Sequence, residues 1–281
     1  VEKADLATIN QETIIAKSYE PSGYPLFNSP QEVGEEVKKI GFDVVNLANN
    51  HMLDKGAKGL SEAIDFWNNI GGITMTGAYK DENDMNRLEY IEKDGIKIGL
   101  VGITRYTNGL SLPKDSALKI IYTSDEDTIK SKIQKAKAEC DIVLVNVHWG
   151  EEYTTTPNND QRELASKMAS WGADVIIGHH PHVIQPVEWI DNGNGTKTLV
   201  AYSLGNFISQ QNTASRVIGG MLHYDLTKDY DTGKTTVDNV VFEPMCEAAT
   251  MFRSIPFRNT PIRSQKPKLQ DSNKTISALN I

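Results

Sequence analysis

Five of the six histidines in this chain directly follow apolar, strand-like segments. Two of them, His180 and His182, flank Pro181 in what is predicted to be an extended turn, so their rings should point to the same side. The proline stiffens that turn and lowers the entropy lost in holding both rings. Neutral imidazoles with carboxylates and amides nearby are typical ligands of divalent transition metals. The other histidines that follow strands are His51, His148 and His179.

Each of these histidines also fits an ordinary structural role when it is taken alone. A histidine such as His148, which precedes Trp149, is often a packed and hydrogen-bonded residue. The pair Asn49-Asn50 also fits a simple turn, because asparagine favours such conformations. His223 lies inside an alternating strand pattern and is predicted to be structural or surface-exposed. The metal-site hypothesis therefore depends on the other histidines sharing one edge of a sheet.

Segments rich in β-branched residues alternate with helix-like segments through the middle of the chain. This alternation predicts buried strands joined by helical crossovers, and thus an α/β fold with a largely parallel sheet. The carboxyl ends of parallel strands meet at one edge, so the histidines are predicted to converge there. The predicted strands are residues 43–47, 96–103, 141–147, 174–177 and 198–203, and the predicted helices are residues 57–70, 125–139 and 160–171.

The last third of the chain has a different character. Hairpin signals at residues 191–195 and 231–233 predict antiparallel strands in this part. Residues 1–263 contain no internal repeat or long linker, and they are predicted to form a single domain. The polar tail, residues 264–281, is not expected to adopt firm structure.

The composition argues against several classes of protein. The 281 residues carry a formal charge of −8, from 37 acidic and 29 basic side chains, which argues against nucleic acid as a partner. The two cysteines form no Cys-x-x-Cys pair, so a zinc finger or a redox motif does not fit. No apolar run approaches the roughly 20 residues of a membrane span, and the polar first residues do not resemble a signal peptide.

Several blocks of the sequence resemble, in order, the signatures of the CapA/PgsA family of bacterial capsule-synthesis proteins. Residues 46–56 read Asn-Leu-Ala-Asn-Asn-His-Met-Leu-Asp-Lys-Gly and resemble one of these signatures. The family is similar to the calcineurin-like metallophosphoesterases, which implies a four-layer α/β sandwich around two metal ions. The other matching blocks are residues 141–150, 177–186 and 202–207, and the opening residues 4–13 resemble an early block with an Asn-x-Glu core.

This resemblance implies a role for several side chains. It makes Asn50 a metal ligand and His51 the acid that faces the leaving group, with Asp54 as the residue that orients the ring of His51. Glu12 stands where a bridging carboxylate is expected. The implied cofactor is a divalent metal, Mn²⁺, Fe or Zn²⁺. The remaining predicted metal ligands are His148, His180 and His182, and the predicted substrate-binding residues are Arg105 and Asn206.

One departure from the family pattern concerns the first strand. The family begins with a strand that ends in Gly-Asp, and no such pair precedes Asn10 in this sequence. Either that N-terminal strand is missing or the metal site has lost a carboxylate ligand, and both alternatives predict incomplete occupancy by two metals. The departure also predicts either an exposed sheet edge or a gap that another segment fills.

Three hypotheses for the function stay open. The first is metal-dependent hydrolysis or transfer at a phosphoester. The second is a polymer-handling or assembly module without turnover, and the third is a degenerate fold kept as a partner surface. A polyanionic product fits poorly with the charge of −8, unless metals or local cations such as Arg105 and Arg216 bind it.

The resemblance also implies a cellular setting. Proteins of this family are linked to the synthesis or export of poly-γ-glutamate, usually as anchored proteins at the extracellular face of the cell membrane. The implied partners are poly-γ-glutamate or another anionic polymer, a phosphoester substrate, and capsule-synthesis membrane proteins. The chain itself is expected to be soluble, since it carries no apolar span.

Overall fold

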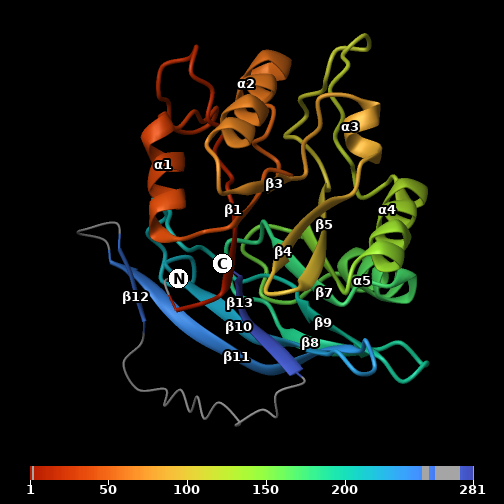
Figure 1. Cartoon of the computed structure of the whole chain (residues 1–281). Helices are drawn as coiled ribbons and strands as arrows, with labels where there is room; N and C mark the ends of the chain where they lie inside the picture. The colour runs from red at the N-terminus through yellow and green to blue at the C-terminus, as the bar shows by residue number, and fades with distance from the viewer. Residues whose placement is uncertain (2, 249–252, 257–272, 281) are drawn as a thin grey trace.

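Two β-sheets face each other in the molecule, and helices cover their outer faces (Figure 1). The computed structural model describes residues 1, 3–248, 253–256 and 273–280. The first sheet contains, in order, β12 (Arg253–Pro256), β11 (Thr235–Ala248), β10 (Ile218–Asp229), β13 (Asn273–Asn280), β1 (Leu6–Asn10), β2 (Val44–Asn46) and β3 (Thr74–Thr76). The second sheet contains, in order, β4 (Glu89–Lys93), β5 (Ile96–Thr104), β6 (Ile142–His148), β7 (Val175–His179), β9 (Lys197–Ala201) and β8 (Val187–Asp191).

Three hydrophobic clusters fill the three interfaces of this four-layer sandwich. On the outer face of the first sheet, α2 buries Leu60, Ala63, Ile64 and Trp67, which recur at helical spacing. The central cluster joins the inner faces of both sheets. The four-layer α/β fold expected from the resemblance is confirmed. The helices are α1 (Gln31–Ile40) and α2 (Gly56–Asn69) on the first sheet, α4 (Glu126–Glu139) and α5 (Asn159–Trp171) on the second, and the short α3 (Glu82–Asn86).

The second sheet brings polar side chains together at the carboxyl ends of its parallel strands. Strands β5, β6, β7 and β9 run parallel, and β4 and β8 pair antiparallel at the two edges. β6 is buried along its whole length, as expected for a central strand of a parallel sheet. The register aligns Thr104 with His148 and His148 with His179. The predicted convergence is therefore confirmed for these strand ends. The prediction that His51 shares the edge of the same sheet is wrong, because the strand before it, β2, belongs to the first sheet.

The expectation of a tail without firm structure after Arg263 is wrong for β13. This strand pairs parallel with β1 and antiparallel with β10, so its backbone has partners on both sides. Ile276 and Ala278 are buried in the central cluster, and Thr8 Oγ1 donates a hydrogen bond to Asn280 Oδ1 at 2.5 Å. Local composition is polar here, but pairing with distant strands decides the conformation. The remainder of the predicted tail, residues 264–272 and 281, lies outside the described residues.

Strand β13 decides between the two predictions for the edge of the sheet. β1 is not an exposed edge, because β2 lies on one side of it and β13 on the other (Figure 1). Of the two alternatives, a gap filled by another segment is the one observed. The segment that fills the gap, β13, comes from the opposite end of the chain. Its Ala278 pairs with Leu6, which lies 272 residues earlier in the sequence.

The helices in the described part of the chain are short. The longest, α2 and α4, have 14 residues each. A helix that crosses a bilayer needs about 20 predominantly apolar residues. None of the described helices is long and apolar enough to span a membrane.

A core substitution tests whether β13 is an integral strand. Ile276→Ala should lower the free energy of unfolding by about 2–5 kcal/mol, because it removes a fully buried side chain between the two sheets. Urea unfolding of the purified chain measures this loss. Val241→Ala, at a half-exposed position of β11, is the control and should change stability by less than about 0.5 kcal/mol. Equal stabilities of the two variants would contradict the packing of β13.

Candidate metal centre

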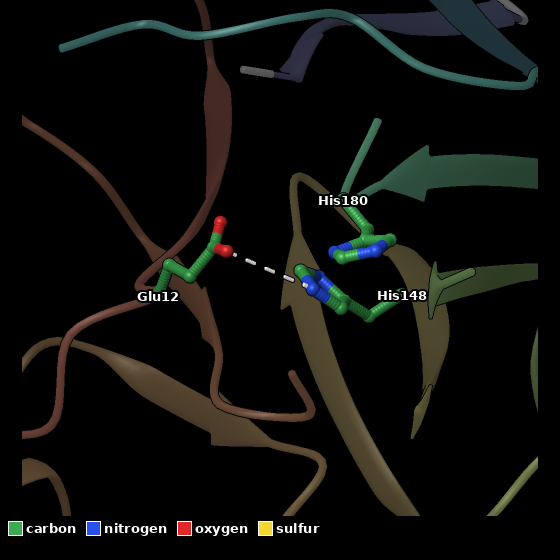
Figure 2. Close-up of side chains that lie close together, drawn as sticks. All are labelled: Glu12, His148 and His180. Atoms are coloured by element: carbon green, nitrogen blue, oxygen red, sulfur yellow. Dashed lines mark ion pairs between the residues drawn. The ribbon is translucent and has the colours of Figure 1, made fainter. Parts of the chain in front are cut away.

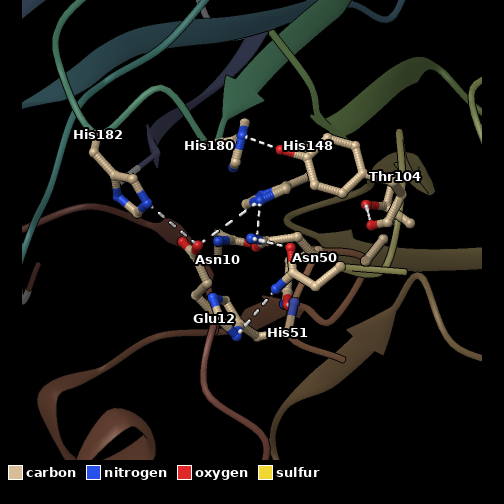
Figure 3. A network of polar contacts seen from close by, with 12 residues as sticks. Asn10, Glu12, Asn50, His51, Thr104, His148, His180 and His182 are labelled. Carbon is tan, nitrogen blue, oxygen red and sulfur yellow. Dashed lines mark hydrogen bonds and ion pairs between the residues drawn. The ribbon is translucent and has the colours of Figure 1, made fainter. Parts of the chain in front are cut away.

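The predicted ligands come from both sheets and meet at one rim (Figure 3). Glu12 follows β1, and Asn50 and His51 follow β2, both strands of the first sheet. His148 is the last residue of β6, and the turn that holds the other two ligand histidines follows β7, in the second sheet. The two layers therefore face each other across the site, and neither sheet alone supplies a complete set of ligands.

Glu12, His148 and His180 form the first group of side chains that can hold a metal ion (Figure 2). One ligand atom from each lies within 4.8 Å of the others, and Glu12 Oε1 lies 3.8 Å from His148 Nε2. Glu12 Oε1 is buried without a hydrogen-bond partner among the described residues. A buried carboxylate oxygen without a donor is costly, so this atom fits a cation better than it fits a closed protein core.

Asn50 completes this group from the side of the first sheet. Its Oδ1 lies 2.9 Å from His148 Nε2. An amide oxygen and an imidazole nitrogen at this separation either share a proton or bind one cation side by side, and both arrangements keep the two atoms facing each other. The predicted ligands Glu12, Asn50, His148 and His180 are thus brought together.

His182 extends the cluster on the other side of Glu12. Its Nε2 lies 3.7 Å from the same Glu12 Oε1. Its Nδ1 donates a hydrogen bond to Asn206 Oδ1 at 2.8 Å, and the amide of Asn206 is fixed in turn by donating to Arg216 O at 2.8 Å. This contact leaves the Nε2 lone pair of His182 directed away from Asn206 and available for a cation. Asn206, predicted to bind substrate, here holds a predicted ligand in place.

Tyr106 holds His180 in a similar way. The Tyr106 hydroxyl lies 2.5 Å from His180 Nε2, whereas His180 Nδ1 is buried without a partner among the described residues. A second group that can hold a metal combines His180, His182 and Glu152, with ligand atoms within 4.8 Å of one another. Metal-binding imidazoles usually donate their other ring nitrogen to a neighbouring oxygen, and Tyr106 supplies such a partner.

The turn between His180 and His182 differs from the predicted extended geometry. Both histidines adopt positive φ angles, 97° and 57°, in the left-handed region. Each such residue costs on the order of 1–3 kcal/mol and persists only where surrounding contacts impose it. The rings still converge, with centroids 5.9 Å apart. The prediction of convergence holds, and that of an extended backbone is wrong.

Burial keeps His148, His179 and His180 neutral. Burial and the neighbouring His180 hold the pKa of His148 well below its usual value. Burial and His182 lower the pKa of His180 to about 3, and burial alone does the same for His179. Burial also raises the pKa of Glu12, and the charge of His182 partly opposes this. Imidazoles bind metals in their neutral form. A cation beside Glu12 would offset the unfavourable free energy of burying its charged carboxylate.

His51 is held by the residue predicted to orient it. Asp54 Oδ2 lies 2.8 Å from His51 Nδ1 and also accepts the backbone N–H of Phe27 at 2.7 Å. The side chain of Asp54 is fully buried. The ring of Phe27 meets the His51 ring edge-on, with centroids 4.6 Å apart. These contacts fix the orientation of the imidazole and leave its Nε2 as the nitrogen that can exchange a proton with a ligand.

Arg105 lies apart from the converging ligands. Its Nη1 donates to Gly150 O at 2.9 Å, and its Nη2 is 3.7 Å from Asp160 Oδ2. It lines a separate surface pocket beside Trp149, not the cavity next to the histidines. Its charge still contributes to the lowered pKa of His180, after burial and His182. Substrate binding by Arg105 stays a prediction.

Two residues in the loop after β5 contribute to the site without having been predicted. Tyr106 contacts His180, and Asn108 Oδ1 accepts a hydrogen bond from Asn50 Nδ2 at 3.2 Å. The loop directly follows a predicted strand, so the rule that places functional residues at strand ends applies to it as well. In the sequence, Arg105 stands out in this loop by its charge, whereas Tyr106 and Asn108 carry no such signal.

A cavity of about 620 Å³ opens beside the cluster. Glu12, His180, His182 and Asn206 line one end of it, and Val33 and Val37 of α1 line another part. Its size falls within the usual range of about 300–1,000 Å³ for small-molecule sites. The site therefore combines a possible cation position with space for a ligand.

The sandwich of two sheets covered by helices has the metallophosphoesterase-like fold. The crystal structure of a 5'-nucleotidase candidate from Staphylococcus aureus, in complex with α-ketoglutarate, matches this chain with a TM-score of 0.52. The match covers 78% of this chain and 41% of that one, at 18% sequence identity. At this identity the likeness concerns the fold alone.

The chain belongs to the family of bacterial capsule synthesis proteins described as PGA_cap, which matches residues 1–211. It is 34% identical over 218 residues to the capsule biosynthesis protein CapA of Bacillus anthracis, covering 76% of this chain and 50% of that protein. It is 33% identical over 202 residues to the PGA biosynthesis protein CapA of Bacillus subtilis (strain 168). This match covers 72% of this chain and 51% of that protein. The resemblance seen in the sequence is thus confirmed, and the chain spans about half the length of these relatives.

Replacing the carboxylate of Glu12 tests the metal centre. Glu12→Gln should abolish most of the rise in melting temperature on adding Mn²⁺ or Zn²⁺, and it should lower the metal content after dialysis. In chelator the variant should gain about 1 kcal/mol of stability, because a buried carboxylate without a donor becomes neutral. Glu163→Gln, on the exposed face of α5, is the control. Unchanged metal affinity in Glu12→Gln would contradict the assignment.

The buried histidines predict a pH dependence of stability in chelator. The pKa of His179 is about 3 in the folded chain, below its usual 6.5. The free energy of unfolding is therefore highest above pH 6.5, where this histidine is neutral in both states, and it falls as the pH is lowered. Between pH 7.5 and 5.5 this residue alone should cost about 1.4 kcal/mol. His179→Asn should reduce the loss by that amount in urea unfolding at the two pH values. An identical loss in the variant would refute the prediction.

Proposed function

We propose that this chain is a metal-dependent phosphoesterase-type hydrolase that acts in the synthesis of a poly-γ-glutamate capsule. The observation that carries the proposal is the position of Glu12 Oε1, which lies 3.8 Å from His148 Nε2 and 3.7 Å from His182 Nε2. A carboxylate between two imidazoles in this way suits the bridging position of a two-metal site. The names of the two relatives supply the context of capsule and PGA biosynthesis.

The residues fit a divalent cation through their chemistry. Glu12, Asn50, His148 and His180 would hold one ion, and Glu152 and His182, together with Glu12, would hold another. Oxygen and imidazole ligands of this kind suit Mn²⁺, Fe or Zn²⁺. A bound ion supplies Lewis-acid stabilisation to the reacting phosphoryl group. The position next to His182 has fewer protein ligands among the described residues, so we expect it to bind its ion less tightly.

His51 is the proposed proton donor to the leaving group. Asp54 holds Nδ1, so the proton to be transferred is at Nε2. Asp54 also stabilises the charged imidazolium, because it is buried and lies 2.8 Å from the ring. Phe27 packs against the ring and limits the access of water to it.

The substrate, the partners and the cellular location of the protein are part of the same proposal. We expect the substrate or product to be poly-γ-glutamate, another anionic polymer or a phosphoester linked to its assembly. We expect membrane proteins of capsule synthesis as partners, and action at the extracellular face of the membrane by an anchored native protein. Asn206 and Arg105 remain candidates for contact with the substrate in addition to the contacts described above.

Turnover of an aryl phosphodiester by the Mn²⁺-loaded chain tests the proposal. His51→Asn should lower kcat by roughly 100- to 10,000-fold, because a general acid contributes about that much. Its metal content should equal that of the unsubstituted chain. His223→Asn is the matched control, since His223 lies in β10 and pairs with Glu243 Oε2 at 2.9 Å. Absence of turnover in the metal-loaded chain would favour a polymer-handling module instead. Equal turnover in His51→Asn would contradict the role of His51 as the general acid.

A further inference from the structure

Arg216 is connected to the candidate metal centre through its backbone. It lies just before β10, and its carbonyl oxygen accepts the Asn206 Nδ2 hydrogen bond at 2.8 Å. Asn206 Oδ1 in turn accepts from His182 Nδ1 at 2.8 Å. Only one side chain therefore separates Arg216 from a predicted metal ligand, and the position of its main chain is tied to that of the ligand.

The side chain of Arg216 is connected to the same histidine by stacking. Its guanidinium carbon lies 3.3 Å from the centre of the Tyr153 ring. The Tyr153 ring stacks on that of His182, with centroids 6.1 Å apart and an interplanar angle of 29°. The backbone N–H of Tyr153 donates to Pro181 O at 2.8 Å, which fixes the tyrosine to the histidine turn. The guanidinium is therefore held beside the centre by two separate parts of the chain.

Arg216 lacks the partner that the comparable arginines have. Among the described residues, Arg87 pairs with Asp84, Arg105 with Asp160 and Arg162 with Glu188. No ion pair of the described residues includes Arg216, and its Nε is buried without a hydrogen-bond partner. The acidic neighbour of Tyr153, Glu152, belongs to the group with His180 and His182.

An unpaired guanidinium at this place suits an anionic ligand. Partial burial removes hydration from the charge, and the Tyr153 ring orients its plane, so little entropy is lost on binding. Guanidinium groups bind carboxylates in a bidentate manner, and such bonds are about twice as strong as neutral ones. The chain as a whole carries a charge of −8, so an anionic substrate needs a local cation at the site.

We propose that Arg216, held by Tyr153, forms a subsite that binds a carboxylate of a γ-glutamyl chain beside the candidate metal centre. The inference rests on the proposed function, because it names the substrate class of that same site. Every residue of a γ-linked glutamate chain carries one free carboxylate. The Tyr153 ring holds the guanidinium on the His182 side of the centre, so a chain bound next to His182 can present a carboxylate to it.

Direct binding of a γ-glutamyl pentamer to the metal-loaded chain tests this subsite. Calorimetric titration at low salt should give binding that Arg216→Gln weakens about tenfold, the loss of one charged hydrogen-bonded contact. Arg216→Lys keeps the charge but loses the planar fork and its stacking on Tyr153, so its affinity should lie between those of Arg216→Gln and the unsubstituted chain. Arg87→Gln, which removes an exposed arginine outside the site, is the control for net charge and should bind normally. Melting temperatures check that each variant is folded.

A neutral ligand completes the experiment. A pentamer with its carboxylates converted to carboxamides should bind the unsubstituted chain about tenfold more weakly than the acid does, and Arg216→Gln should not weaken it further. Equal binding of the two pentamers, equal binding of the acid by Arg216→Gln, or no binding of the acid at all would overturn the subsite. Phosphodiester turnover is measured separately, so its failure alongside arginine-dependent binding would overturn the proposed function and not the recognition of carboxylate.

Discussion

The arrangement of the site depends on one carboxylate oxygen that has no hydrogen-bond donor. Glu12 Oε1 lies between His148 and His182, at 3.8 and 3.7 Å, and no described residue donates to it. Such an atom is unfavourable in a closed core, so the surrounding structure has to hold it there. The two sheets do so because β1 and β6 belong to different layers and end at the same rim (Figure 3).

A set of hydrogen bonds determines the orientation of each imidazole. Asn206 occupies Nδ1 of His182, Tyr106 occupies Nε2 of His180, and Asp54 occupies Nδ1 of His51. Each contact leaves the other nitrogen of its ring for a ligand or a proton. The left-handed backbone of the histidine turn is tolerated for the same reason, since these contacts and the packing of the rings impose it. The geometry of the cluster is thus built by residues that do not themselves ligate.

The family relationship and the site geometry support different parts of the interpretation. The relatives place the chain among capsule synthesis proteins, although it spans about half of their length. The convergence of a carboxylate, an amide and three imidazoles indicates the chemistry available at the rim. The unpaired guanidinium of Arg216 adds a means of recognising an acidic chain, which neither the family nor the ligand cluster specifies. Together they support the proposal of a site in which a cation and an arginine offset the negative charge of the chain for an anionic substrate.

The sequence by itself determined the class of the fold and most of the cluster. Runs such as residues 141–147 are apolar and β-branched enough to form only a buried strand, and a polar residue at the end of a parallel strand has to lie at the rim. His148, His180, His182, Asn50 and Glu12 were found in this way or through the family motifs that contain them.

Only the tertiary structure decided the features that depend on pairing between distant segments. Residues 273–280 are polar in sequence, yet they form a central strand because β1 and β10 satisfy both of its edges. The roles of Asn206 and Tyr106 follow from the nitrogen that each one contacts, and no local pattern encodes that choice. A sequence carries the period of its hydrophobic residues along the chain, whereas register across sheets and the partner of each polar atom arise only when the layers pack.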